Sequence, residues 1–123
     1  MKAALIEILE SFDYPVFLQG SLNPDESYPD SFFTFWNFET PENEYYSNDS
    51  GAAVWGFWVY FYSNDPEKVE TVTDAAWATL KAAGWTMDGR PNDITVDKPT
   101  HTGRMFTIYG YQKYEEVMDN AGS

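Results

Sequence analysis

The chain has few residues that could carry catalytic or metal chemistry. It contains no cysteine and a single histidine, His101, which lies between Thr100 and Thr102 in a turn-forming run. A serine nucleophile needs a base, and only His101 could serve, yet no GxSxG motif is present. A zinc site built from His and Cys has no second ligand. A lone loop histidine is typical of a solvated or capping residue, so we expect no catalytic residue, no metal site and no cofactor.

Carboxylates are abundant, but no pair of them is singled out. Asp88, Asp93 and Asp97 bracket one turn region, with a spacing that does not match a calcium-binding loop. Two carboxylates beside aromatic platforms could form a glycosidase pair, although acids in turns are common for conformational reasons. The glycines form neither GxGxxG nor GxxxxGK[ST], so no phosphate cradle is predicted. We expect a protein that is not an enzyme, with a carbohydrate-handling enzyme as an open alternative.

The charge balance excludes several kinds of partner. The chain of 123 residues has 7 basic and 20 acidic residues, for a formal net charge of -13. Binding to phosphate backbones or to anionic membranes needs clustered cations, which are missing here. The basic residues are scattered singly: Lys2, Lys68, Lys81, Arg90, Lys98, Arg104 and Lys113. We therefore expect no specific nucleic-acid binding and no membrane binding.

The length favours one domain over residues 1–123. The absence of cysteine fits a reducing compartment. Glu7 and Glu10 interrupt the apolar pattern of the N-terminus, which argues against a signal peptide, and no stretch reaches membrane-spanning length. These features predict a soluble protein made in the cytosol.

The stretch Ala52–Ser63, AAVWGFWVYFYS, is the strongest structural signal and predicts a central strand. Successive side chains of a strand point to opposite faces. Its odd positions are wholly apolar and belong in a core, whereas its even positions carry the polar-tipped rings of Trp58, Tyr60 and Tyr62. The even face must be covered by a helix, a loop or another chain. Either the N-terminal helix covers it, or it is an interface between protein chains, for which Trp36, Trp58 and Tyr60 are the candidate residues.

The other elements follow from periodicity and turn signals. A second strong strand, Ser31–Glu39, is expected to pair with Ala52–Ser63 as a hairpin across the acidic segment Thr40–Gly51. A long helix is expected over about 66–83, with Asp65 as its N-cap and Gly84 as its left-handed C-terminal residue. The remaining predictions are a helix at Lys2–Phe12, strands at Val16–Gln19, Ile94–Asp97 and Arg104–Tyr114, turns at Met87–Asn92 and Lys98–Gly103, and a flexible tail at 115–123.

The predicted order is α-β-β-β-α-β-β, an α+β fold with a mostly antiparallel sheet. Tyr45 and Tyr46 lie in the long Thr40–Gly51 connection. Tyrosines on such a loop either bind a protein partner or fold back onto the sheet edge, and both readings stay open.

Four runs of the sequence resemble a known family: SYPDSFFTFWNFET, AAVWGFWVYFYSNDPEKVE, AAGWTMDG and PTHTGRMFTIY. They are similar to the small tail-terminator or tail-completion (head–tail joining) proteins of long-tailed phages and prophages, over roughly Tyr28–Tyr111. The resemblance implies a small α+β subunit, often monomeric before assembly, that closes into a ring, typically six-fold. Such rings stop the growth of the tail tube and bind the neck. Family members have no catalytic residue or cofactor.

These observations lead to an expected function: a structural virion protein that caps the tail tube, located in the tail or neck and, during assembly, in the host cytoplasm. The expected partners are further copies of the chain, the tail tube and the neck or connector proteins. Acidic residues are expected to line part of the lumen, where they would not retain DNA. The alternative is a small acidic protein-binding module or inhibitor of a host protein.

Overall fold

A single five-stranded sheet is the centre of the computed structural model, which describes residues 2–19, 29–40, 52–96 and 99–113. The strands are β1 (Val16–Leu18), β2 (Ser31–Glu39), β3 (Ala52–Ser63), β4 (Thr86–Ile94) and β5 (Thr102–Lys113), and their order across the sheet is β1-β2-β3-β5-β4. β1 runs parallel to β2, and every other pair is antiparallel. The mixed sheet and the order α1-β1-β2-β3-α2-β4-β5 confirm the predicted α+β class.

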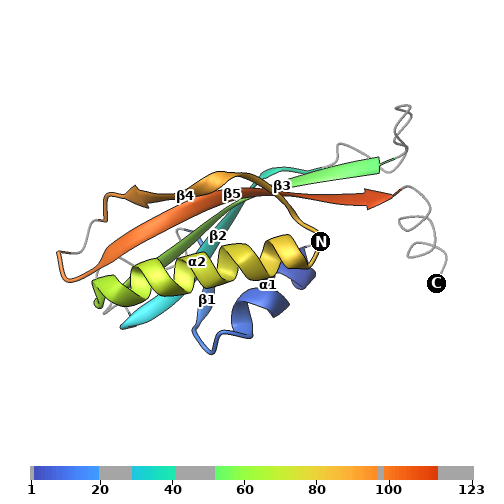
Figure 1. The fold of residues 1–123 in the computed structure, drawn as a ribbon. Coiled ribbons are helices and arrows are strands. Elements are labelled where there is room, and N and C mark those ends of the chain that lie inside the picture. Colours follow the sequence, from blue (N-terminus) through green and yellow to red (C-terminus); the bar gives the residue numbers. More distant parts are fainter. Residues whose placement is uncertain (1, 20–28, 41–51, 97–98, 114–123) are drawn as a thin grey trace.

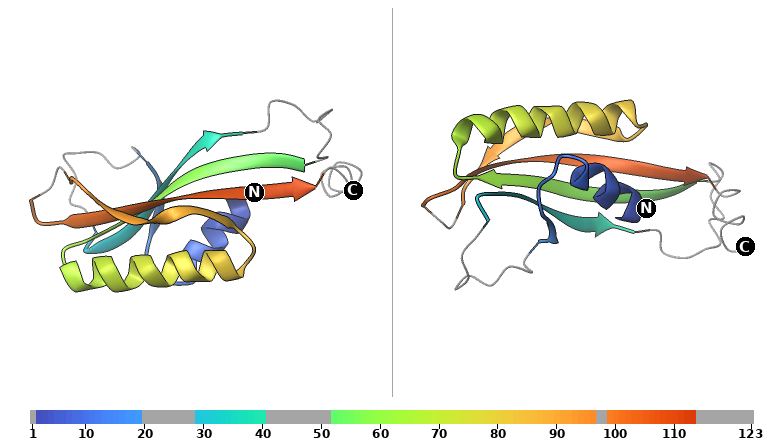
Figure 2. Two further views of the ribbon diagram at one scale, coloured as in Figure 1. Left: turned by 45° about the horizontal axis from the view of Figure 1, so that its top comes forward. Right: turned by 90° about the horizontal axis from the view of Figure 1, so that it is seen from below.

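The two helices, α1 (Lys2–Glu10) and α2 (Pro66–Ala82), both lie on the same side of the sheet (Figures 1 and 2). Leu5 and Leu9 of α1 share one hydrophobic cluster with Ala76 and Leu80 of α2. The proposal that α1 covers the opposite side of the sheet is therefore wrong. The apolar side of α1 packs against the same face of the sheet as the apolar side of α2.

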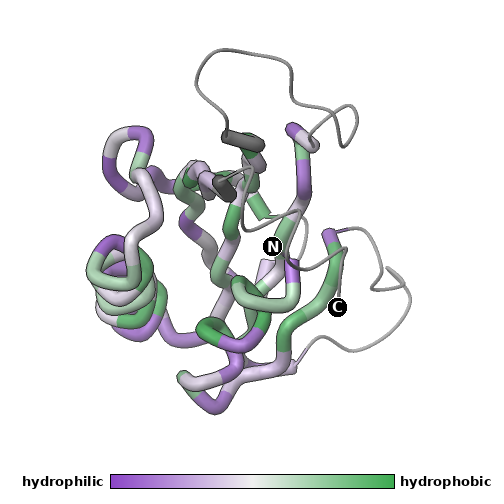
Figure 3. Tube along the Cα trace, turned by 90° about the vertical axis from the view of Figure 1, so that its right-hand side faces the viewer, coloured by the Kyte–Doolittle hydropathy of each residue, from purple (hydrophilic) through white to green (hydrophobic). Residues whose placement is uncertain are grey.

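The core is built from the odd positions of the central strand, as their apolar character predicts. Phe57, Val59 and Phe61 are fully buried. Their neighbours across the sheet are buried as well: Phe33 and Phe35 on β2, and Phe106 and Ile108 on β5. In the end-on view of Figure 3 the central strands carry hydrophobic stretches, whereas α2 is hydrophobic on one side and hydrophilic on the other.

Both ends of α2 follow the local signals of the sequence. The Asp65 side chain accepts a hydrogen bond from the backbone N–H of Glu67 at 3.0 Å, which satisfies a donor of the first turn. At the other end Gly84 has a φ of 103°, and the N–H groups of Gly84 and Trp85 donate to Lys81 O and Leu80 O. These two bonds form a Schellman motif. It turns the chain so that Trp85 packs into the core.

The region after α2 differs from the prediction. Residues Met87–Asn92 were expected to form a turn and Ile94–Asp97 a strand, but β4 spans Thr86–Ile94 and ends there. Its pairing with β5 is interrupted between Asp88 and Asn92, where Gly89 adopts a φ of 79°. An irregular, Gly- and Pro-containing edge strand resembles a turn in sequence, and only pairing with β5 keeps it extended.

Two boundaries also shift by a few residues. The first helix ends at Glu10 instead of Phe12, and β5 begins at Thr102, within the segment expected to be a turn. No helix in the described part of the chain is both long and apolar enough to cross a membrane.

Candidate protein-binding surface

The side of the sheet away from the helices is here called the open face. Strand alternation and register place on it the even positions of β2 and β3 together with the odd positions of β5. On the three central strands these residues are mostly aromatic: Phe32, Thr34, Trp36, Phe38, Val54, Gly56, Trp58, Tyr60, Tyr62, Met105, Thr107, Tyr109 and Tyr111.

One half of the open face is closed by its own side chains. Phe32 is 1% exposed, stacks on Tyr62 with ring centroids 5.1 Å apart, and meets Phe17 of β1 edge-on at 6.0 Å. His101 lies beside this group, with its ring centroid 6.1 Å from that of Phe32. Phe32 is therefore buried within this half of the face, and Tyr62 and His101 are partly buried around it.

His101 connects two segments that are distant in sequence. Its Nε2 lies 2.8 Å from the carbonyl oxygen of Pro29, and its Nδ1 lies 2.9 Å from the Thr100 hydroxyl. Because a carbonyl can only accept, Nε2 carries the proton and donates. The histidine thus links the residue Pro29, which precedes β2, to the segment at the start of β5.

The other half of the open face is exposed. Trp36 is 43% exposed, Trp58 37% and Tyr111 52%. Trp36 and Trp58 are direct partners in the β2–β3 register. We call this exposed half the aromatic patch and define it as Trp36, Phe38, Trp58, Tyr60, Tyr109 and Tyr111.

A glycine allows the rings of the patch to lie close to the sheet. A Cβ atom built on Gly56 would stand 2.7 Å from Cζ of Phe38, far inside van der Waals contact. The Phe38 ring therefore lies over Gly56, stacked on Trp58 at 5.0 Å and edge-on to Tyr109 at 5.7 Å. This packing pre-orders the Trp58 indole before any partner arrives.

The patch carries no charge, although the chain as a whole has a net charge of -13. Among the open-face positions whose side chains the structure describes, one is acidic and none is basic: Glu39, the register partner of Gly56, lies at the end of β2 beside the patch. Burial raises the pKa of the Tyr60 phenol above its usual value of 10.0, so this group also stays neutral. The described acidic residues lie instead on the helices, the turns, the strand ends and β4.

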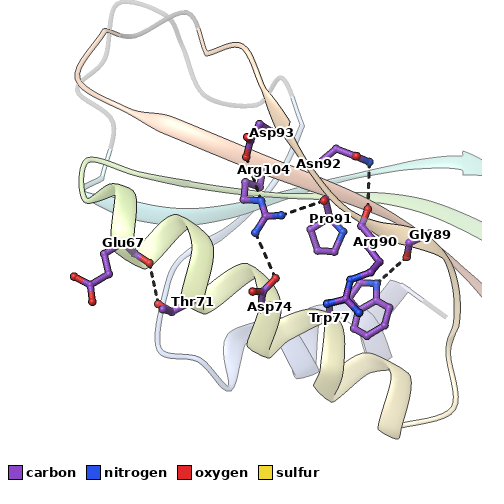
Figure 4. Close-up of polar contacts among 10 residues, drawn as sticks. All are labelled: Glu67, Thr71, Asp74, Trp77, Gly89, Arg90, Pro91, Asn92, Asp93 and Arg104. Atoms are coloured by element: carbon purple, nitrogen blue, oxygen red, sulfur yellow. Dashed lines mark hydrogen bonds and ion pairs between the residues drawn. The ribbon is translucent and has the colours of Figure 1, made fainter.

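A groove of about 490 Å³ lies elsewhere, between the start of α2 and the β4–β5 edge. Its charged lining is Glu70, Asp93 and Arg104. Arg104 forms ion pairs with Asp74 at 3.4 Å and with Asp93 at 3.3 Å and donates to the carbonyl of Pro91 (Figure 4). None of the exposed aromatic side chains lines this groove. Among the described residues, no group of three or more His, Cys, Asp or Glu side chains could hold a metal ion.

The structure brings together three of the five candidate residues. Trp36, Trp58 and Tyr60 share the aromatic patch, while Tyr45 and Tyr46 lie outside the described residues. The candidates omitted Phe38 of β2, and they omitted Tyr109 and Tyr111 because the sequence does not reveal that β5 is the neighbour of β3. The alternating aromatic pattern of Met105–Tyr111 was the available signal.

In comparisons with known proteins, no protein-family model matches the chain and no curated protein sequence matches it significantly. The functional argument therefore depends on the surface itself.

Proposed function

We propose that the protein is a structural virion subunit, a tail-terminator or head–tail joining protein that assembles as a ring at the end of a phage tail tube. The observation that carries this proposal is the aromatic patch, a neutral surface of ordered rings on a strongly acidic chain. The sequence resemblance to tail-completion proteins supplies the biological setting. The partners would be further copies of the chain, the tube and the neck.

A neutral patch is what the self-association of such a chain requires. Copies with a net charge of -13 repel one another, and an uncharged contact surface adds nothing to that repulsion. Protein interfaces are depleted in charged residues at their centres and enriched in Trp and Tyr. Trp36 and Trp58 are uncharged aromatic residues that are exposed and paired across two strands, and the described ion pairs lie among other residues.

A ring also requires that the patch meet a different surface on the next copy. Such a head-to-tail contact closes when the rotation per subunit divides a full turn. In such a ring the acidic residues would lie mainly on the surfaces outside this contact. A lumen that carries some of them would let DNA pass without binding it.

The proposal is tested by electron microscopy of tail tubes assembled from the tube and tape-measure proteins of the same genome, with and without this protein. We expect tubes of uniform length, capped at one end, only when the protein is present. The variant Trp36→Ser/Trp58→Ser should abolish capping. Leu18→Ser is the matched control, because Leu18 is 45% exposed but lies on β1, outside the patch.

Tubes whose lengths and ends do not change would contradict the terminator function. In that case the patch would be the binding surface of a small acidic module directed at a host protein. A stable complex with such a protein, lost in the Trp36→Ser/Trp58→Ser variant and kept in Leu18→Ser, would establish that alternative.

A further inference from the structure

A second surface feature lies on the helix side of the sheet, where two cations from different elements meet at one indole. Trp77 of α2 has the Lys81 ammonium 5.1 Å from its ring and the Arg90 guanidinium of β4 4.8 Å from its ring. The Trp77 Nε1–H group donates to the Gly89 carbonyl at 3.0 Å (Figure 4). The irregularity of β4 at Gly89 therefore both anchors the indole and brings Arg90 over it.

The nearby Arg104 has different surroundings from these two cations. Arg104 is 19% exposed and is neutralised by two carboxylates, those of Asp74 and Asp93. Arg90 and Lys81 are both exposed, and in the described part of the chain no carboxylate lies within ion-pair distance of either. In a chain with 20 acidic residues, two adjacent cations are thus left without a carboxylate partner that the structure describes.

We propose that Arg90 and Lys81, arranged around Trp77, bind carboxylates of a second copy of the chain. A guanidinium that lies against an aromatic ring keeps its N–H donors at its edge, where a carboxylate can accept two of them. The stacking also lowers the conformational entropy that Arg90 would lose on binding. The Lys81 ammonium adds a second positive charge from the last turn of α2.

Charge complementarity identifies the second copy as the partner. The chain carries 13 more acidic than basic residues, so any neighbouring copy presents carboxylates. The aromatic patch has no charge and cannot use them. The cationic site is built from α2 and β4, and the patch from β2, β3 and β5, so this contact does not depend on the proposed function.

The test is sedimentation equilibrium of the full chain, up to about 1 mM, in 50 mM and 500 mM NaCl, with far-UV circular dichroism to verify folding. We expect Lys81→Gln/Arg90→Gln to weaken self-association at least tenfold at low salt. The control, Lys2→Gln/Lys68→Gln, removes the same two charges from exposed helix positions and should weaken it less than threefold. Arg90→Lys should fall between wild type and the double variant, since it keeps the charge and loses the planar donors.

Equal effects of the two double variants would overturn the proposal, as would an association that 500 mM NaCl does not weaken. A wild-type chain that stays monomeric over the whole range would overturn it too. If Trp36→Ser/Trp58→Ser abolishes association and Lys81→Gln/Arg90→Gln does not, this site fails while the proposed function is retained.

Discussion

The substitution Gly56→Ala tests how the aromatic patch is built. The added Cβ would stand 2.7 Å and 2.8 Å from two atoms of the Phe38 ring and 3.0 Å from Cβ of Glu39. The ring must move, and with it the contacts that Phe38 makes with Trp58 and Tyr109. We therefore expect the substitution to destabilise the fold through one neighbouring side chain, not through the backbone of residue 56.

The magnitude follows from two opposing effects. Overpacking costs about 1–3 kcal/mol when a ring must leave its place. Ala is about 0.5–1 kcal/mol better than Gly inside a strand, since it loses less conformational entropy on folding. We expect Gly56→Ala to lower the free energy of unfolding by about 0.5–2 kcal/mol, the difference between the overpacking and entropy terms.

A double-mutant cycle isolates the contact. In a Phe38→Ala background the ring is absent, and only the 3.0 Å approach to Glu39 opposes the new methyl group. Gly56→Ala should then cost less than about 0.5 kcal/mol, because the main clash is gone. Urea denaturation followed by circular dichroism measures all four proteins. An equal cost of Gly56→Ala in both backgrounds would refute the described packing of Phe38.

Three further predictions test other parts of the structure. Gly84→Ala should lower the free energy of unfolding by about 1–2 kcal/mol in thermal denaturation, since a φ of 103° is strained for any residue with a Cβ. A loss of stability smaller than that caused by Ala83→Gly, one residue earlier, would contradict the Schellman motif. Because burial raises the pKa of Tyr60 in the folded state, its contribution to stability is fully present below the unfolded pKa near 10.0 and is lost as the pH rises through the folded pKa. Tyr60→Phe should flatten the alkaline decline in stability, and an unchanged decline would refute this assignment. Asp93→Ala should change the free energy of unfolding by less than about 0.5 kcal/mol, because the Asp93 side chain is 93% exposed. Arg104→Ala should lower it further, because the variant loses the packing of the side chain and its hydrogen bond to Pro91. Equal losses of the two variants in chemical denaturation would show that the Asp93 ion pair matters more than its exposure implies.

Local sequence signals predicted those elements that are stabilised by nearby residues. The limits of α2 follow from Asp65, Pro66 and Gly84, which satisfy the helix ends within a few residues of the chain. The strands β2 and β3 follow from long alternating aromatic runs, which fit no helix. β4 could not be found in this way, because its Gly-Arg-Pro segment is extended only through its pairing with β5, a segment that follows later in the chain.

The candidate surface was likewise predicted in part by local sequence patterns and decided in part only by the tertiary structure. Alternation within each strand already places Trp58 and Tyr60 on one face and Phe57 and Val59 on the other, since the side-chain period of a strand is two. Which face would be covered was decided only by tertiary packing, when both helices joined the odd-numbered side and left the aromatic patch open. The meeting of Arg90 with Trp77 and Lys81 likewise depends on the position of β4 beside α2, a contact between elements that no local pattern encodes.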